Sequence, residues 1–186
     1  MVKYLLNKPE MKRVLVIDPK HTFSHPRFKY SNKIPLDRDF WVIYRPQPDK
    51  ETELVALFRE AFKRGNITIY IDELMTLNDA FPQATEILAD IVRTGREKGV
   101  GVWVAIQRPM WIPKEFLTET EIFMIFTLRL GDDRVYMSKF IGDQALLKLP
   151  AYAFLFDRAD EGKPVALHLN IRKDQIETVK EAVSYD

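Results

Sequence analysis

Cysteine is absent from the 186 residues, which excludes disulfide bonds and thiolate metal sites and suits a reducing cytoplasm. No apolar run approaches the ~20 residues of a membrane span, and no signal-peptide pattern opens the chain. Lysine and arginine total 28 and aspartate and glutamate total 27, so the formal net charge of +1 provides no broad basic field for nucleic acid. We therefore expect a cytoplasmic protein without membrane insertion.

Two apolar runs rich in β-branched and aromatic residues are the main positive signal. Residues 67–71 (Ile-Thr-Ile-Tyr-Ile) lead directly into Asp72 and Glu73, and residues 100–106 (Val-Gly-Val-Trp-Val-Ala-Ile) lead into Gln107. Continuous runs of this kind are typical of strands buried on both faces of a parallel sheet. Polar residues where such strands end lie at the carboxyl edge of the sheet, where open α/β folds bind their ligands.

Adjacent carboxylates at this edge suit nucleotide hydrolysis. In such a site one carboxylate can hold Mg²⁺ and the next can polarise the attacking water. The alternative interpretation of Asp72 and Glu73 is an acidic cap at the start of the following helix.

The order of these features resembles the FtsK–HerA superfamily of hexameric motor ATPases. The carboxylate pair is followed by an amphipathic helix and then by residues 94–109, Thr-Gly-Arg-Glu-Lys-Gly-Val-Gly-Val-Trp-Val-Ala-Ile-Gln-Arg-Pro. The resemblance extends from about Met1 to the region of Arg134. The superfamily includes DNA translocases, conjugation ATPases and viral genome-packaging ATPases.

The resemblance implies a role for each matching residue. Asp72 corresponds to the Walker B metal carboxylate, Glu73 to the catalytic base and Gln107 to the polar sensor of the γ-phosphate. Arg96 corresponds to the arginine inserted into the neighbouring subunit's site, where a guanidinium stabilises charge on the transferred phosphoryl group. The alternative for Arg96 is a solvated arginine at a helix end.

The Asp-Pro-Lys sequence at residues 18–20 also matches the family and implies that Asp18 and Lys20 lie next to bound ATP. The alternative is a polar strand end at which proline stops the ladder.

The family's phosphate-binding loop, Gly-x-x-x-x-Gly-Lys-[Ser/Thr], does not occur in the chain. Residues 1–6 resemble the end of the helix that follows this loop. Our hypothesis is that the first strand and the loop lie upstream of Met1. The alternative is a degenerate protein that has lost nucleotide binding.

The predicted fold is α/β and RecA-like (the ASCE class of P-loop NTPases), a mainly parallel sheet flanked by helices within a single domain, 1–186. The first strand and the phosphate loop are missing, and a β-hairpin (152–156 with 165–169) and a small helix (177–183) end the chain. Helices are expected at 51–64 and 82–98, a further strand at 122–128, and Trp111 as a buried anchor.

The function that follows is the ATP-hydrolysing core of an oligomeric nucleic-acid translocase, a DNA packaging or transfer motor using ATP and Mg²⁺. The implied partners are DNA, identical subunits in a ring (a hexamer) and a portal, capsid or conjugation protein, in the host cytoplasm if the protein is viral. One alternative is a non-catalytic scaffold or regulatory subunit. Another is an unrelated flavodoxin-like binding domain.

Overall fold

The computed structural model describes residues 2–6, 8–35, 39–170 and 175–179. The described part of the chain divides into two compact units, of which the first is Val2–Gln107 and the second begins at Arg108. The prediction of a single domain over residues 1–186 stays a prediction.

The first unit is built on a parallel sheet of five strands in the order β2-β3-β1-β4-β5. The strands are β1 (Arg13–Ile17), β2 (Lys29–Tyr30), β3 (Phe40–Tyr44), β4 (Thr68–Ile71) and β5 (Gly101–Val104). In β1, Val14–Ile17 are fully buried, because this strand lies between β3 and β4 in the middle of the sheet. The predicted parallel sheet is confirmed.

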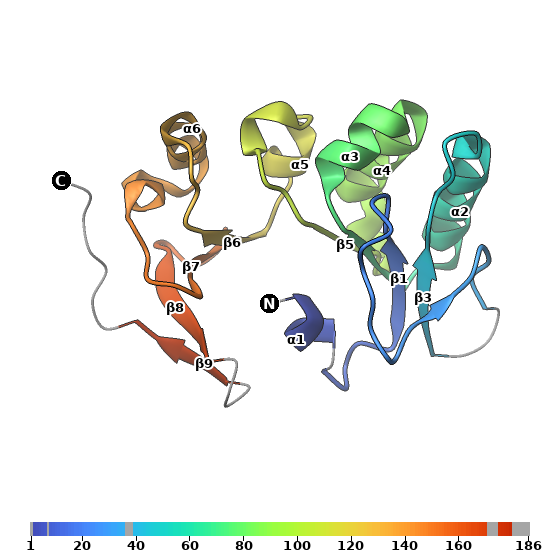
Figure 1. Ribbon diagram of the computed structural model, residues 1–186, viewed down its shortest axis with the longest axis horizontal. Helices are drawn as coiled ribbons and strands as arrows, with labels where there is room; N and C mark the ends of the chain where they lie inside the picture. Colours follow the sequence, from blue (N-terminus) through green and yellow to red (C-terminus); the bar gives the residue numbers. More distant parts are fainter. Residues whose placement is uncertain (1, 7, 36–38, 171–174, 180–186) are drawn as a thin grey trace. The chain divides into compact units, whose positions relative to one another are not determined.

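Helices connect these strands and cover the sheet (Figure 1). They are α1 (Val2–Leu6), α2 (Glu51–Arg64), α3 (Leu74–Ala80) and α4 (Pro82–Thr94), with a 3₁₀ turn, η1, at Gly95–Lys98. In Figure 1, α2, α3 and α4 group together and α1 lies apart from them. Leu6 of α1 packs with Val14 and Val16, so α1 covers that face of β1. The side chains of Leu15 and Ile17 point to the opposite face, because neighbours in a strand alternate.

The burial of residues 100–106, the run that contains β5, differs from the prediction. Gly101 is exposed and residues 102–106 are half-buried, so the expectation of burial on both faces is wrong for them. The reason is the position of the strand: β5 pairs with β4 on one side, and no described strand pairs with its other side.

The second unit contains a four-stranded antiparallel sheet in the order β6-β7-β8-β9. The strands are β6 (Ile122–Phe126), β7 (Ala153–Arg158), β8 (Val165–Asn170) and β9 (Gln175–Thr178). The helices and 3₁₀ turns are η2 (Pro109–Trp111), α5 (Glu115–Thr118), α6 (Gly131–Ile141) and η3 (Asp143–Leu146). The predicted hairpin is confirmed as β7 and β8.

The predicted terminal helix is wrong where it can be compared, because Glu177 and Thr178 belong to β9 and pair with β8. The rest of that prediction, 180–183, lies outside the described residues. Glu177 lies opposite His168 in this antiparallel ladder, and the pairing of β9 with the preceding strand β8 outweighs local helix propensity. None of the helices in the described part of the chain has the length and apolar character that crossing a bilayer requires.

Candidate functional site

The carboxyl ends of β1, β4 and β5 form one edge of the parallel sheet. Ile71 pairs with Ile17 on one side and with Val104 on the other, so the three strands end at the same level. Asp18 and Asp72 follow their strands directly, and Gln107 follows β5 three residues on. The structure therefore brings Asp18, Asp72 and the end of β5 to the edge where the sequence predicted a site.

Glu73 occupies a constrained position at this edge. Its backbone has φ 81° and ψ 86°, a left-handed conformation that is costly for a residue such as glutamate. The flanking amides hold the turn in place, because Asp72 N donates to Ile17 O at 2.9 Å and Leu74 N donates to Ala105 O at 3.0 Å. Strain of this kind concentrates at sites where function requires the geometry.

The Glu73 side chain points into the protein. The residue is only 5% exposed, and its Oε1 is buried without a hydrogen-bond partner among the residues that the structure describes. Its Oε2 lies 3.4 Å from Nζ of Lys20, whose side chain is 40% exposed. A buried carboxylate oxygen without a partner is unusual in a folded protein and marks a place where a polar group can bind.

Asp72 is half-buried and accepts a hydrogen bond from the Tyr70 hydroxyl at 2.8 Å. Burial raises the pKa of Tyr70 above its usual value, and the hydrogen bond to Asp72 adds to the shift. The tyrosine therefore remains a proton donor that orients one oxygen of the Asp72 carboxylate.

The donor chemistry of Asp72 fits Mg²⁺, because hard divalent cations prefer carboxylate oxygens. Among the described residues there is no group of three or more His, Asp or Glu side chains that could hold a metal ion alone. A cation here would therefore need further oxygen ligands from water or from a nucleotide, as is usual for Mg²⁺ in phosphoryl-transfer sites.

Asp18 has a different environment from Asp72. It is fully buried, and its carboxylate accepts hydrogen bonds from the backbone amides of Thr22 at 3.0 Å and Phe23 at 3.1 Å. Arg45 Nε donates to Oδ2 of Asp18 at 2.9 Å. These contacts give Asp18 the role of an anchor for the turn after β1, and its contact with a nucleotide stays a prediction.

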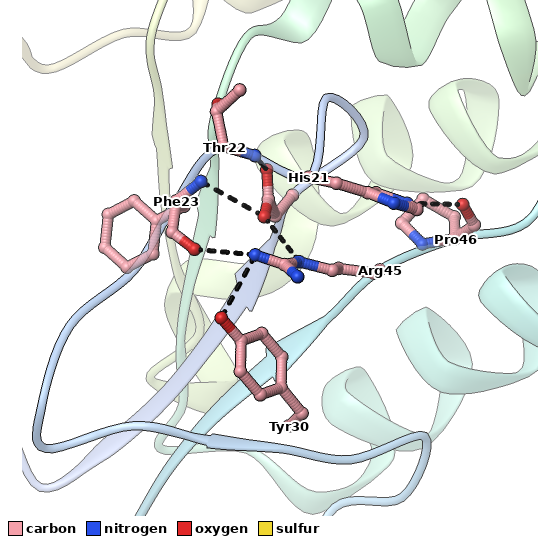
Figure 2. A network of polar contacts seen from close by, with 7 residues as sticks. His21, Thr22, Phe23, Tyr30, Arg45 and Pro46 are labelled. Atoms are coloured by element: carbon pink, nitrogen blue, oxygen red, sulfur yellow. Dashed lines mark hydrogen bonds and ion pairs between the residues drawn. The ribbon is translucent and has the colours of Figure 1, made fainter.

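Arg45 is a site residue that sequence reasoning missed. Figure 2 shows its guanidinium between Phe23 and Tyr30, where it donates to the Phe23 carbonyl at 3.1 Å and to the Tyr30 hydroxyl at 3.0 Å. The available signal was its position directly after β3, which places it at the same edge of the sheet as Asp18.

Arg96 does not join this edge. It is an exposed residue of η1, which precedes β5 and so lies toward the amino edge of the sheet. The four residues of β4 separate the two edges by roughly 13 Å, at about 3.3 Å per residue. Arg96 therefore lies away from Glu73 of the same chain, and Gln107 is exposed at the carboxyl edge.

The second unit contains a buried ion pair close in sequence to Gln107. Arg108 Nε donates to Oδ2 of Asp133 at 2.7 Å, and Oδ1 of the buried Asp133 has no partner. The Arg108 guanidinium also lies 4.1 Å from the ring centre of Trp111, which is 58% exposed. The expectation that Trp111 is a buried anchor is wrong, because the exposed ring packs beside a guanidinium instead of in an apolar core.

Comparison with known proteins gives a match in sequence over part of the chain. No protein-family model matches the chain. A stretch of 93 residues is 31% identical to the DNA packaging ATPase P9 of Enterobacteria phage PRD1. The match covers 50% of this chain and 38% of P9, so the chain spans well under two thirds of that curated relative.

The fold is similar to that of the genome packaging NTPase B204 from Sulfolobus turreted icosahedral virus 2. The B204 complex with AMPPCP gives a TM-score of 0.65 at 15% identity, with 89% of this chain and 86% of B204 covered. The complex with ATP-gammaS gives 0.60 at 16% identity, with 98% and 88% covered. Identities this low show a common fold only.

The sequence match to P9 and the fold match to B204 both support the predicted resemblance to the FtsK–HerA superfamily, which includes viral genome-packaging ATPases. The α/β fold predicted from that resemblance is confirmed, with the antiparallel sheet of the second unit as an addition.

Proposed function

We propose that this chain, which resembles viral genome-packaging ATPases in sequence and fold, is the ATP-hydrolysing core of an oligomeric DNA-packaging motor. The observation that carries the proposal is Glu73: a buried glutamate in a left-handed turn at the carboxyl edge, with one carboxylate oxygen unpartnered. Such a group suits a general base, because proton transfer needs an acceptor held in a fixed orientation.

In the proposed reaction, Glu73 accepts a proton from water as the water oxygen bonds to the γ-phosphorus and the bond to the ADP oxygen breaks. Asp72, oriented by Tyr70, would hold Mg²⁺ through a carboxylate oxygen. When bound, the cation neutralises charge that develops on the phosphate oxygens. Gln107 is the polar residue that responds to the γ-phosphate at the end of β5.

Arg96 is proposed to act in the site of a neighbouring subunit. The position of η1 before β5, away from the carboxyl edge that carries Glu73, supports this assignment. A ring, for which we propose six subunits, would place each Arg96 against the ATP of the next subunit, where it stabilises the developing charge.

Phosphate-binding amides are proposed to come from a strand and loop outside residues 1–186. One side of β5 pairs with no strand of the described residues, which supports this, because an apolar parallel strand half-exposed at an edge is uncommon. A further parallel strand would bury it. A loop after that strand would reach the carboxyl edge beside Asp72 and Gln107.

The proposed partners are DNA, identical subunits and a viral portal or capsid protein, in the cytoplasm of an infected host. A conjugation partner would replace the portal if the motor transfers DNA between cells.

The test is to isolate the protein from its natural source, determine its intact mass and measure ATP hydrolysis with and without double-stranded DNA. The proposal predicts a mass above 21.8 kDa, a Gly-x-x-x-x-Gly-Lys-[Ser/Thr] sequence in the additional segment, and hydrolysis that DNA stimulates. A mass of 21.8 kDa without ATP hydrolysis would favour a non-catalytic scaffold that keeps the fold.

A further inference from the structure

The backbone of Lys20 is held by contacts that leave its side chain available. The turn of residues 18–21 closes with His21 N donating to Asp18 O at 3.2 Å, and His21 adopts φ 59°. The buried Asp18 carboxylate fastens the following residues through the amides of Thr22 and Phe23 (Figure 2). Lys20 therefore projects from an anchored turn rather than from a free loop.

Its ammonium group lies against the proposed base. Lys20 Nζ is 3.4 Å from Oε2 of Glu73, whose other oxygen, Oε1, is buried without a partner. The two oxygens of one carboxylate thus have different surroundings. A buried carboxylate without a counter-charge is disfavoured as an ion, and only the ion can accept a proton.

We propose that Lys20 is a positioning residue that acts through Glu73: it holds Oε2, so that the ionised carboxylate presents Oε1 to the attacking water. This inference rests on the proposed function of the same site. Here Lys20 acts on Glu73, the proposed base, whereas the resemblance alone would place Lys20 beside the nucleotide.

The contact itself is tested without ATP, by a double-mutant cycle of thermal unfolding on the natural full-length protein. We expect Lys20→Met to lower the melting temperature by about 2–4 °C in the wild-type background. In the Glu73→Gln background, which has no carboxylate charge to hold, Lys20→Met should change it by less than about 1 °C. Lys29→Met, at an exposed lysine of β2, is the matched control and should give the same small effect in both backgrounds. Equal effects of Lys20→Met in the two backgrounds would overturn the proposal.

The consequence for catalysis is tested by steady-state kinetics of the natural full-length protein. Lys20→Met should lower kcat by about 10- to 100-fold, the cost of a misplaced catalytic group, with KM for ATP within about twofold of wild type. Lys20→Arg, which keeps the cation, should recover most of kcat. Adding Lys20→Met to Glu73→Gln should cause no further loss. A rise in KM with kcat retained would make Lys20 a nucleotide ligand and overturn the proposal.

The two experiments separate the failure of this inference from the failure of the proposed function. If the unfolding cycle shows no coupling, the proposed Lys20–Glu73 contact is wrong, and the proposal that the protein hydrolyses ATP still stands. Absence of hydrolysis by the wild-type full-length protein overturns the proposed function and the positioning role with it, whatever the cycle shows.

Discussion

Arg45 and Asp18 form an ion pair that joins the ends of β3 and β1, with Nε of Arg45 donating to Oδ2 of Asp18 at 2.9 Å. Asp18 is fully buried, whereas the Arg45 side chain is 31% exposed, so the aspartate depends on its partners more than the arginine does. The pair fixes the turn that carries Lys20 toward Glu73. This part of the site is therefore both a structural anchor and a support for the proposed base.

Removing the buried carboxylate should be costly. We expect Asp18→Ala to lower the free energy of unfolding by about 3–5 kcal/mol, because it breaks a buried ion pair and leaves two backbone amides without their acceptor. Urea unfolding followed by circular dichroism measures this. Glu53→Gln, in the exposed i,i+3 pair with Lys50, is the control and should leave the midpoint unchanged. A wild-type midpoint for Asp18→Ala would contradict the anchoring role.

Because the backbone of Glu73 is left-handed, we expect glycine at this position to relieve strain and to abolish activity. Glu73→Gly should exceed Glu73→Ala in free energy of unfolding by about 1 kcal/mol, because both lack the carboxylate and glycine adopts φ 81° without strain. The same substitution should abolish ATP turnover. The comparison is Asn66→Gly at φ 50°, where the gain should be less than about 0.5 kcal/mol because asparagine tolerates this region. A free energy of unfolding for Glu73→Gly no higher than that of Glu73→Ala would show that the turn is not strained.

The raised pKa of Tyr70 predicts how the free energy of unfolding changes at alkaline pH. Because burial and the Asp72 hydrogen bond raise its pKa in the folded protein, the unfolded chain loses the phenolic proton first as pH rises. The contribution of Tyr70 is therefore fully present below pH ~10 and is lost progressively above it. Urea unfolding between pH 9 and pH 11 should show a steeper fall for wild type than for Tyr70→Phe. Tyr152→Phe, at an exposed tyrosine, should keep the wild-type slope.

The proposed action of Arg96 in the neighbouring subunit's site predicts that two inactive variants restore ATP hydrolysis when they are mixed. Arg96→Ala and Glu73→Gln should each be inactive alone in the full-length protein, since each lacks one part of every site. Mixed assemblies should recover activity, because some sites then combine an intact Glu73 with an intact Arg96 from the neighbour. Arg93→Ala, one helical turn earlier and paired with Asp90, is the control and should hydrolyse ATP normally. Failure of the mixture to recover activity would assign Arg96 to its own subunit or to structure.

The parallel sheet and the position of the site could be predicted from the sequence because they depend on local patterns. The run before Asp72 and Glu73 carries its own strand signal, and its end determines the edge at which the carboxylates lie. The same reasoning failed for β5, because burial depends on a neighbouring strand that the run itself does not specify.

The remaining features depend on contacts between distant residues. Arg45 is 27 positions from Asp18, and Lys20 is 53 positions from Glu73, so no spacing pattern could reveal either pair. The left-handed conformation of Glu73 was also hidden, because glutamate carries no preference for it. Strand β9 replaced the predicted helix for a different reason: it pairs with β8, its neighbour in sequence, and this pairing outweighs local propensity.

The central claim is that Glu73 is the base of an ATP-hydrolysing site, and the direct measurement is ATP turnover and ATP binding by Glu73→Gln in the natural full-length protein. The account predicts that turnover falls by about 10²- to 10⁴-fold, the usual contribution of a general base, while the affinity for ATP stays within about threefold of wild type. Turnover at the wild-type rate would contradict the account, because the buried, unpartnered oxygen of Glu73 would then have no part in the reaction.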